Sequence, residues 1–170
     1  KDRYYGTIQR IEISQVKDSE YVIKKNLSYT VVLLPQAIIV LLVSSLIFGA
    51  FSIFDISMFT YLLVSCLLVL FAFNSLGMLI SLFTDSEATA FLASLVVGLP
   101  LLFLSGILFP FEFMPSFVAV FGKLMPLAPA MSAMQSALIY NAPDFSTHLE
   151  LLAYVMVFNF ITIVAKGLKK

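Results

Sequence analysis

The chain has 170 residues, of which 61% are hydrophobic and only 12% are charged. A water-soluble domain carries about 25% charged residues to cover its surface, so this composition excludes an ordinary soluble protein and indicates one whose solvent is lipid. The ten basic and ten acidic residues cancel, so the net charge predicts no partner and we expect no nucleic-acid binding.

A polar segment of mixed charge occupies residues 1–25. Ile8 and Ile11 are three positions apart and would share one face of a helix, with the charged residues elsewhere around it. Asp18 or Ser19 is suited to cap a second helix that continues into the first apolar run. Such a segment either lies on the lipid headgroups or docks on a soluble partner, and the pattern alone leaves both readings open.

Three uncharged runs follow, at residues 26–54, 56–84 and 88–110. Crossing a hydrocarbon core of about 30 Å takes about 20 helical residues, so each run is long enough. The runs lack the alternation of polar and apolar residues that membrane β-strands show, and helices satisfy their own backbone hydrogen bonds in lipid. We therefore predict three transmembrane helices with these bounds.

Small and polar side chains within the apolar runs mark candidate contacts between helices. Ala90, Ser94 and Gly98 are spaced four apart, and such a row of small side chains permits close helix packing. Three polar residues lie at membrane depth: Gln36, Asn74 and Asn159. They either line a transport pathway or form hydrogen bonds between helices, and we favour the hydrogen bonds. No charged residue lies deep in any run, which argues against an ion-coupled carrier.

The C-terminal third contains two further apolar runs, at residues 124–143 and 151–165, and either could cross. Nine of the ten basic residues lie before the first run or after the last, and the positive-inside rule places both groups in the cytoplasm. An even number of crossings follows, so we predict four, with the last at 148–165 and a cytoplasmic tail at 166–170. The segment 111–147 then enters the membrane from outside and returns to the same side.

Such a re-entrant segment is tolerated in a membrane only where protein or a watery cavity shields its backbone. Pro110 and Pro115 are expected to end the third crossing, and Pro115 or Ser116 to start a short helix that dips back. Glu112 would remain hydrated at the level of the headgroups, while Pro126 and Pro129 would break the short helix. The alternative is a simple extracellular loop with an apolar face.

The sequence supplies no catalytic or metal-binding set. His148 is the only histidine and Cys66 the only cysteine, and neither has the partners that a triad or a metal site requires. A phosphate-binding loop is missing as well. We therefore expect no catalytic residue, no metal and no cofactor on this chain, which we treat as a single domain.

Taken in order, several blocks resemble the C-terminal part of the membrane subunit of type-2 ATP-binding-cassette (ABC) exporters. They are the cytoplasmic GTIQRIEISQVKDSEYVIKK, three crossings, SGILFPFEFMP, MPLAPAMSAMQ, a final crossing and a basic tail. The most specific block runs from Ser105 to Pro115. Because these permeases usually have six helices and the chain starts on Lys1 without an initiator methionine, we expect it to be part of a longer protein.

The resemblance implies an all-α integral membrane fold with four transmembrane helices, an N-terminal amphipathic coupling helix and an extracellular re-entrant helical segment. It assigns contact with the ATPase subunit to Gly6, Thr7, Ile8, Arg10, Ile11, Val16, Lys17 and Tyr21. It assigns the outer gate to Pro110, Glu112, Pro115 and Pro126.

The function implied is that of a permease subunit of an ABC exporter in the cytoplasmic membrane. A separate ATPase subunit, which binds ATP and magnesium, would drive alternating access. A second permease copy, identical or different, would complete the transport path. The substrate would be hydrophobic or amphipathic, such as a drug, a lipid or a glycan-like molecule. The alternative is a non-transporting membrane scaffold or assembly factor with the same helical plan.

Overall fold

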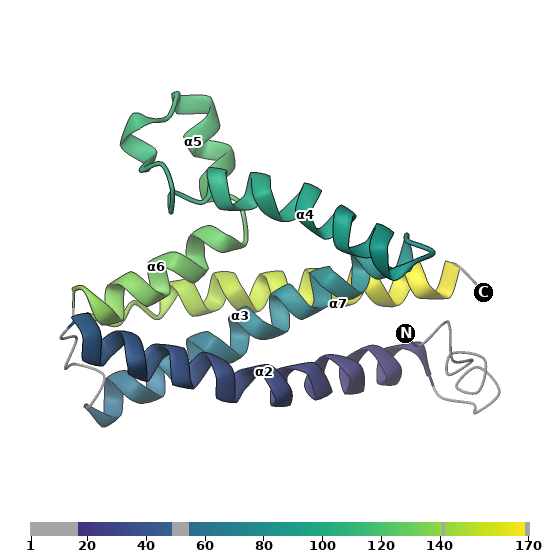
Figure 1. Ribbon diagram of the computed structural model, residues 1–170, viewed down its shortest axis with the longest axis horizontal. Coiled ribbons are helices and arrows are strands. Elements are labelled where there is room, and N and C mark those ends of the chain that lie inside the picture. The colour runs from purple at the N-terminus through teal and green to yellow at the C-terminus, as the bar shows by residue number, and fades with distance from the viewer. Residues whose placement is uncertain (1–16, 49–54, 141, 169–170) are drawn as a thin grey trace.

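The computed structural model describes residues 17–48, 55–140 and 142–168 (Figure 1). In chain order its elements are α2 (Asp18–Phe48), α3 (Ile56–Leu82), α4 (Glu87–Leu104), the short 3-10 helix η2 (Phe111–Phe113), α5 (Ser116–Lys123), α6 (Leu127–Leu138) and α7 (Ser146–Leu168). No strand occurs in the described ranges, which confirms the predicted all-helical class. Four of these helices, α2, α3, α4 and α7, are long and apolar enough to cross a membrane.

Helix α2 joins the end of the polar segment to the first apolar run without a break. It begins at Asp18, well before the predicted boundary at residue 26. Lys24 Nζ lies 2.5 Å from Glu20 Oε1, a pair at the spacing that supports the first turns of a helix. Pro35 lies inside α2 and does not end it. The end of the polar segment and the first apolar run therefore belong to one continuous helix.

Side-chain caps explain where α3 and α4 begin. The Asp55 carboxylate accepts a hydrogen bond from the Ser57 backbone N–H at 3.1 Å, at the start of α3. At the start of α4, the Ser86 hydroxyl accepts from the Thr89 N–H, and the Thr89 hydroxyl accepts from the Ser86 N–H, both at 3.1 Å. This reciprocal capping box fixes a tight turn between α3 and α4.

Helix α4 ends at Leu104, before the predicted boundary at residue 110. Gly106 follows with a φ of +83°, in the left-handed region that residues with a side chain rarely adopt. A Cβ atom at this position would also press against the Phe111 ring. The chain therefore turns at the glycine, and the apolar residues up to Pro110 lie beyond the helix.

Prolines begin the elements of residues 111–138, which we call the outer segment after its predicted position. Pro115 precedes α5 and Pro126 precedes α6. Pro129 lies in the first turn of α6, where a backbone N–H has no partner within the helix and its absence costs little. We expected both prolines to break a helix; Pro126 does lie at the break between α5 and α6, whereas Pro129 lies inside α6. The α5 and α6 axes are bent by 80° at the break between them.

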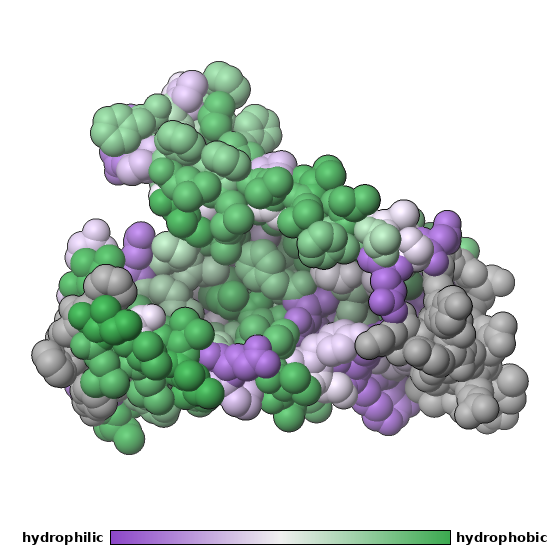
Figure 2. Space-filling model, in the orientation of Figure 1, coloured by the Kyte–Doolittle hydropathy of each residue, from purple (hydrophilic) through white to green (hydrophobic). Residues whose placement is uncertain are grey.

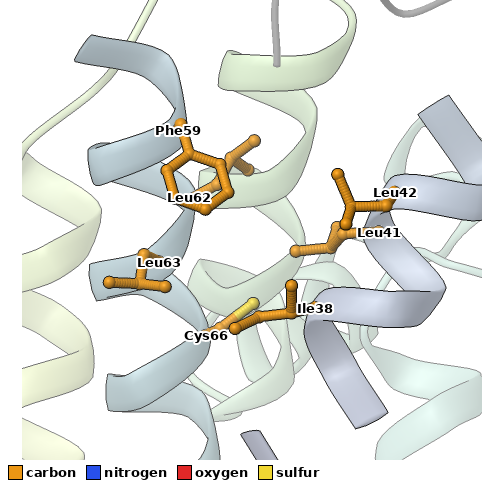
Figure 3. A pocket seen from close by; sticks show the side chains of 7 residues that line it. All are labelled: Ile38, Leu41, Leu42, Phe59, Leu62, Leu63 and Cys66. Carbon is orange, nitrogen blue, oxygen red and sulfur yellow. The ribbon is translucent and has the colours of Figure 1, made fainter. Parts of the chain in front are cut away.

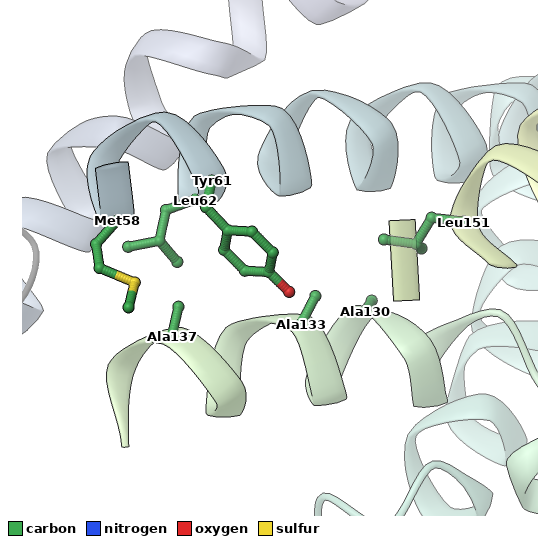
Figure 4. Packing of buried hydrophobic residues seen from close by; sticks show 7 residues of the cluster. All are labelled: Met58, Tyr61, Leu62, Ala130, Ala133, Ala137 and Leu151. Atoms are coloured by element: carbon green, nitrogen blue, oxygen red, sulfur yellow. The ribbon is translucent and has the colours of Figure 1, made fainter. Parts of the chain in front are cut away.

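Helices α2, α3 and α7 lie side by side, α6 packs against α3 and α7, and α4 diverges and carries α5 (Figure 1). The buried apolar cluster consists of Met58, Tyr61, Leu62, Ala130, Ala133, Ala137 and Leu151 (Figure 4). Three alanines on one face of α6 let it approach α3 closely. Apolar residues cover most of the face in Figure 2, as expected for a surface that faces lipid.

Candidate functional site

The first turn of α2 and the last turn of α7 meet at one end of the bundle, in a contact that we call the inner joint after its predicted side of the membrane (Asp18, Tyr21 and Lys166). Lys166 Nζ lies 3.2 Å from Asp18 Oδ1, and the two side chains are only 13% and 20% exposed. The same ammonium group lies 3.4 Å from the centre of the Tyr21 ring, in a cation–π arrangement. The start of α2 and the end of α7 therefore lie on the same side of the bundle.

Two of the predicted ATPase-coupling residues lie at this joint. Lys17 is exposed directly before α2, and Tyr21 is half-buried beneath Lys166. Lys25 Nζ donates to the Tyr21 hydroxyl at 3.1 Å, so Tyr21 contacts two basic side chains. The other predicted coupling positions lie outside the described residues: Gly6, Thr7, Ile8, Arg10, Ile11 and Val16.

A buried polar cluster lies further along the bundle, and we call it the inner polar node (Asn26, Thr30, Asn74, Ser75, Asn159 and Thr162). Asn26 on α2 is fully buried. Its Nδ2 donates to Ser75 Oγ at 2.5 Å and to the Phe71 carbonyl at 3.1 Å, both on α3. It also lies 3.4 Å from Asn159 Oδ1 on α7. One amide thus connects three helices.

Further hydrogen bonds complete the inner polar node. Asn74 Nδ2 donates to Thr30 Oγ1 at 3.2 Å, which joins α3 to α2. Thr162 Oγ1 lies 3.4 Å from the Ser75 carbonyl, which joins α7 to α3. Interhelical bonds of this kind contribute about 0.6 kcal/mol each and at most about 1.7 kcal/mol. Together they hold α2, α3 and α7 in one register.

The three polar residues noted in the sequence therefore occupy different positions. Asn74 and Asn159 belong to the inner polar node, in hydrogen bonds between helices. Gln36 is exposed on α2 and takes no part in the node. A role in a transport pathway remains a prediction for all three. Sequence reasoning missed Asn26, although its spacing of four from Thr30 was a signal that both share a helix face.

A second polar cluster, the outer joint (Tyr61, Ser65, Ser136, Asp144, Thr147 and His148), lies where α3 begins and α7 begins. Tyr61 on α3 is 3% exposed. Its hydroxyl lies 2.9 Å from the Asp144 carbonyl, 3.1 Å from Ser136 Oγ on α6 and 3.2 Å from Thr147 Oγ1 on α7. One phenol group therefore links α3, α6 and α7.

His148 packs within the same joint. Its ring centre lies 4.4 Å from that of Tyr61, and Nε2 lies 2.7 Å from Ser65 Oγ. The Ser65 hydroxyl also lies 2.9 Å from the Tyr61 carbonyl of its own helix, so Ser65 connects His148 to the backbone of α3. Two hydrogen bonds from Ser146, one from its hydroxyl and one from its backbone N–H, hold the pKa of Asp144 below its usual value.

The outer segment is anchored by close backbone packing. A Cβ at Gly122 on α5 would collide with the Leu104 carbonyl oxygen at the end of α4, so only glycine fits there. Lys123 Nζ lies 5.8 Å from the centre of the Phe111 ring. Where α5 ends, the Tyr154 hydroxyl donates to the Leu124 carbonyl at 2.5 Å. The bend between α5 and α6 is thus tied to α7 by one hydrogen bond.

The predicted gate residues lie along this segment. Pro110 precedes η2, Pro115 precedes α5, and both are exposed. Glu112 in η2 is exposed as well, whereas Pro126 is buried at the start of α6. The residues are therefore spread over one continuous segment, and their role as a gate remains a prediction.

The predicted row of small residues on α4 has no helix packed over it within the described residues. Ala90 and Gly98 are half-buried and Ser94 is exposed. A Cβ at Gly98 would meet no atom within 4 Å, and α4 contains no buried residue. Elsewhere too, in the part of the chain that the structure describes, no group of three or more His, Cys, Asp or Glu side chains is placed to hold a metal ion.

These features define a multi-pass helical membrane protein whose helices are joined by buried hydrogen bonds at two levels. The sequence matches the family described as ABC-2 family transporter protein over residues 1–166. The chain therefore belongs to this family, and it is a membrane permease of an ABC transporter. Neither curated proteins nor solved structures gave a match.

Proposed function

We propose that this chain is the permease subunit of an ABC exporter and that a separate ATPase subunit drives it through the segment 6–25. The family membership carries this proposal, because it makes the chain the membrane part of an ATP-driven transporter. ATP and magnesium bind the partner subunit. The exported substrate is hydrophobic or amphipathic, a drug, lipid or glycan-like molecule, in keeping with a chain whose exposed side chains are largely apolar.

Movement of the coupling segment reaches the membrane through α2. Lys17 directly precedes this helix, and the inner joint ties its first turn to the last turn of α7. The inner polar node then ties α2 to α3 and α7. A push from the ATPase therefore displaces these three helices together rather than bending α2 alone.

The outer joint passes this displacement to the outer segment, which closes the exit. Tyr61 connects α3 to α6, and three alanines of α6 pack in the same core. The bend that follows α5 contains Pro126, and Pro110, Glu112 and Pro115 precede α5. Rigid-body tilting of the bundle changes the position of this bent, re-entrant segment and so opens or closes the path on the outer side.

A second permease copy, identical or different, completes the transport path. Helix α4 supports this part of the proposal, since it is long enough to span and has no buried residue. The row of Ala90, Ser94 and Gly98 permits a close approach by a helix of the second copy. The protein lies in the cell membrane with both ends of the chain on the cytoplasmic side, as the positive-inside rule predicts from the basic residues clustered at both ends.

Charge reversal in the coupling segment tests the proposal. We would purify the full-length protein from its own membranes and identify any ATP-hydrolysing partner by mass spectrometry. Arg10→Glu and Lys17→Glu should each reduce the retained ATPase several-fold, because they reverse charge at the predicted contact. Lys123→Glu, a matched reversal on α5, should leave it unchanged.

The outcome separates the exporter from the scaffold reading. Retention of the ATPase in the wild type with loss in both coupling variants supports the exporter. If both variants hold the ATPase as well as the wild type and transport normally, segment 6–25 is not the coupling segment. If the wild type retains no ATPase at all, the chain acts as a scaffold or assembly factor.

A further inference from the structure

The corner between α4 and α5 is packed around the ring of Phe111 in η2. A Cβ atom added at Gly106, just after α4, would lie 2.7 Å from Cε2 of this ring. One added at Gly122, on α5, would lie 2.9 Å from Cε1. Since Cε1 and Cε2 are on opposite edges of a phenyl ring, the ring fills the space between the two glycines. We call this contact the ring contact (Gly106, Phe111 and Gly122).

Further contacts hold the same corner. The Leu104 carbonyl at the end of α4 lies so close to Gly122 that a side chain would not fit between them. Lys123 Nζ lies 5.8 Å from the centre of the Phe111 ring, and the Met114 N–H donates to the Phe111 carbonyl at 3.2 Å. A change in the angle between α4 and α5 would press the ring against backbone already in contact, and close-packed groups yield little.

The other helices form a separate packed body. Leu41 of α2 packs against the buried cluster that α3, α6 and α7 share. Figure 3 shows Ile38 and Leu41 of α2 facing Leu62 and Cys66 of α3. Helix α4, by contrast, contains no buried residue and diverges from these helices beyond its start (Figure 1). Elements with few buried contacts are the ones that move most readily.

We propose that Phe111 is the residue that positions the outer segment, because the ring contact makes α4, η2 and α5 move as one body during transport. This body pivots where it joins the bundle, at residues 83–86 between α3 and α4 and at residues 124–126 between α5 and α6. The hydrogen bond from Tyr154 to the Leu124 carbonyl holds the second pivot against α7. The movement rests on the proposed function, whereas the attachment of α5 to α4 does not.

Distances between spin labels test the attachment without any ATPase. Cysteines replacing Val96 on α4 and Val120 on α5, both exposed, would be labelled in the full-length Cys66→Ala protein. The protein would be reconstituted in lipid with excess unlabelled copies, so that the distance within one chain is measured by pulsed electron paramagnetic resonance. We expect one narrow distribution, which Phe111→Ala should broaden several-fold. Phe113→Ala, which removes an 83% exposed ring from the same short helix, should leave the width unchanged.

Gly106→Ala tests the ring contact from its other side, so the result does not depend on the Phe111 variant alone. Its Cβ would displace the ring, and the mean distance between positions 96 and 120 should shift. Gly98→Ala, whose Cβ would meet no atom within 4 Å, is the matched control and should shift nothing. If neither Phe111→Ala nor Gly106→Ala changes the distribution, the ring does not hold α5 to α4 and the proposal is wrong.

A second pair of labels, at Val120 on α5 and the exposed Met156 on α7, tests the movement in the complex with its ATPase. We expect ATP to change this distance while the distance between positions 96 and 120 keeps its mean. Equal changes in both distances, or no change in either during active transport, would overturn the proposal. If the protein retains no ATPase, the proposed function fails, whereas the widths measured without ATPase still decide whether Phe111 holds α5 to α4.

Discussion

Removing the hydroxyl group of Tyr61 tests whether the outer joint is held by packing or by hydrogen bonds. Tyr61→Phe keeps the ring, which is 3% exposed, and deletes only the oxygen that connects α3 to α6 and α7. Tyr61→Ala removes both. The two variants therefore separate the hydrogen bond from the buried aromatic surface.

The expected losses of stability depend on which acceptor each hydroxyl hydrogen near Tyr61 is bonded to. The Ser136 hydroxyl donates to the Ala133 carbonyl at 3.0 Å, and the Thr147 hydroxyl donates to the Asp144 carbonyl at 2.7 Å. Tyr61→Phe then leaves no buried group without a partner and loses one donated bond, about 1 kcal/mol. Tyr61→Ala also opens a cavity among the alanines of α6, which raises the loss to about 3–5 kcal/mol.

The free energy of unfolding would be measured for the full-length protein by titration from mild detergent into dodecyl sulfate. Tyr140 is the control, since it is 71% exposed near the same end of the bundle, and Tyr140→Phe and Tyr140→Ala should change stability by less than about 0.5 kcal/mol. A loss above about 3 kcal/mol for Tyr61→Phe, or below about 1 kcal/mol for Tyr61→Ala, would refute this reasoning.

Two further predictions concern the ends of the bundle and use the same titration. A double-mutant cycle on Asp18→Ala and Lys166→Ala should give a coupling energy of about 1 kcal/mol, and a value near zero would mean that the inner joint contributes nothing. Gly122→Ala should destabilise by about 1–3 kcal/mol because its Cβ meets the Leu104 carbonyl. Gly77→Ala, with open space around its Cβ, should be neutral or stabilising by up to about 1 kcal/mol, and equal effects at both glycines would contradict the close approach.

The absence of charge over long runs predicted the first three long apolar helices, and the positive-inside rule was needed to predict one further crossing rather than two in the C-terminal third. Lipid imposes the absence of charge directly, because a helix in hydrocarbon must be long and uncharged wherever it crosses. The four helices α2, α3, α4 and α7 correspond to the four predicted crossings. Hydrophobic runs predict the ends of helices less well. Helix α4 ends at Leu104, just before a glycine with positive φ, although the apolar run continues beyond it.

The site was predictable only where single residues carry the signal. Asn74 and Asn159 stand out as polar residues at membrane depth, and both form hydrogen bonds to other helices. Asn26 did not stand out, because it lies at the border between charged and apolar sequence. Its importance comes from the register of three helices, which depends on packing that no single segment encodes. Tyr61 was missed for the same reason, since its partners lie on α6 and α7.

The most direct test of the central claim, four crossings with both ends in the cytoplasm, is the labelling of single cysteines in intact cells. Ser86→Cys, between α3 and α4, and Ser116→Cys, at the start of α5, would each be placed in a Cys66→Ala background and treated with a membrane-impermeant maleimide. We predict that the cysteine at position 116 reacts in intact cells and that the one at position 86 reacts only after the cells are opened. Reaction of both from the same side would contradict the four-crossing arrangement and the positions of the coupling segment and the outer gate that depend on it.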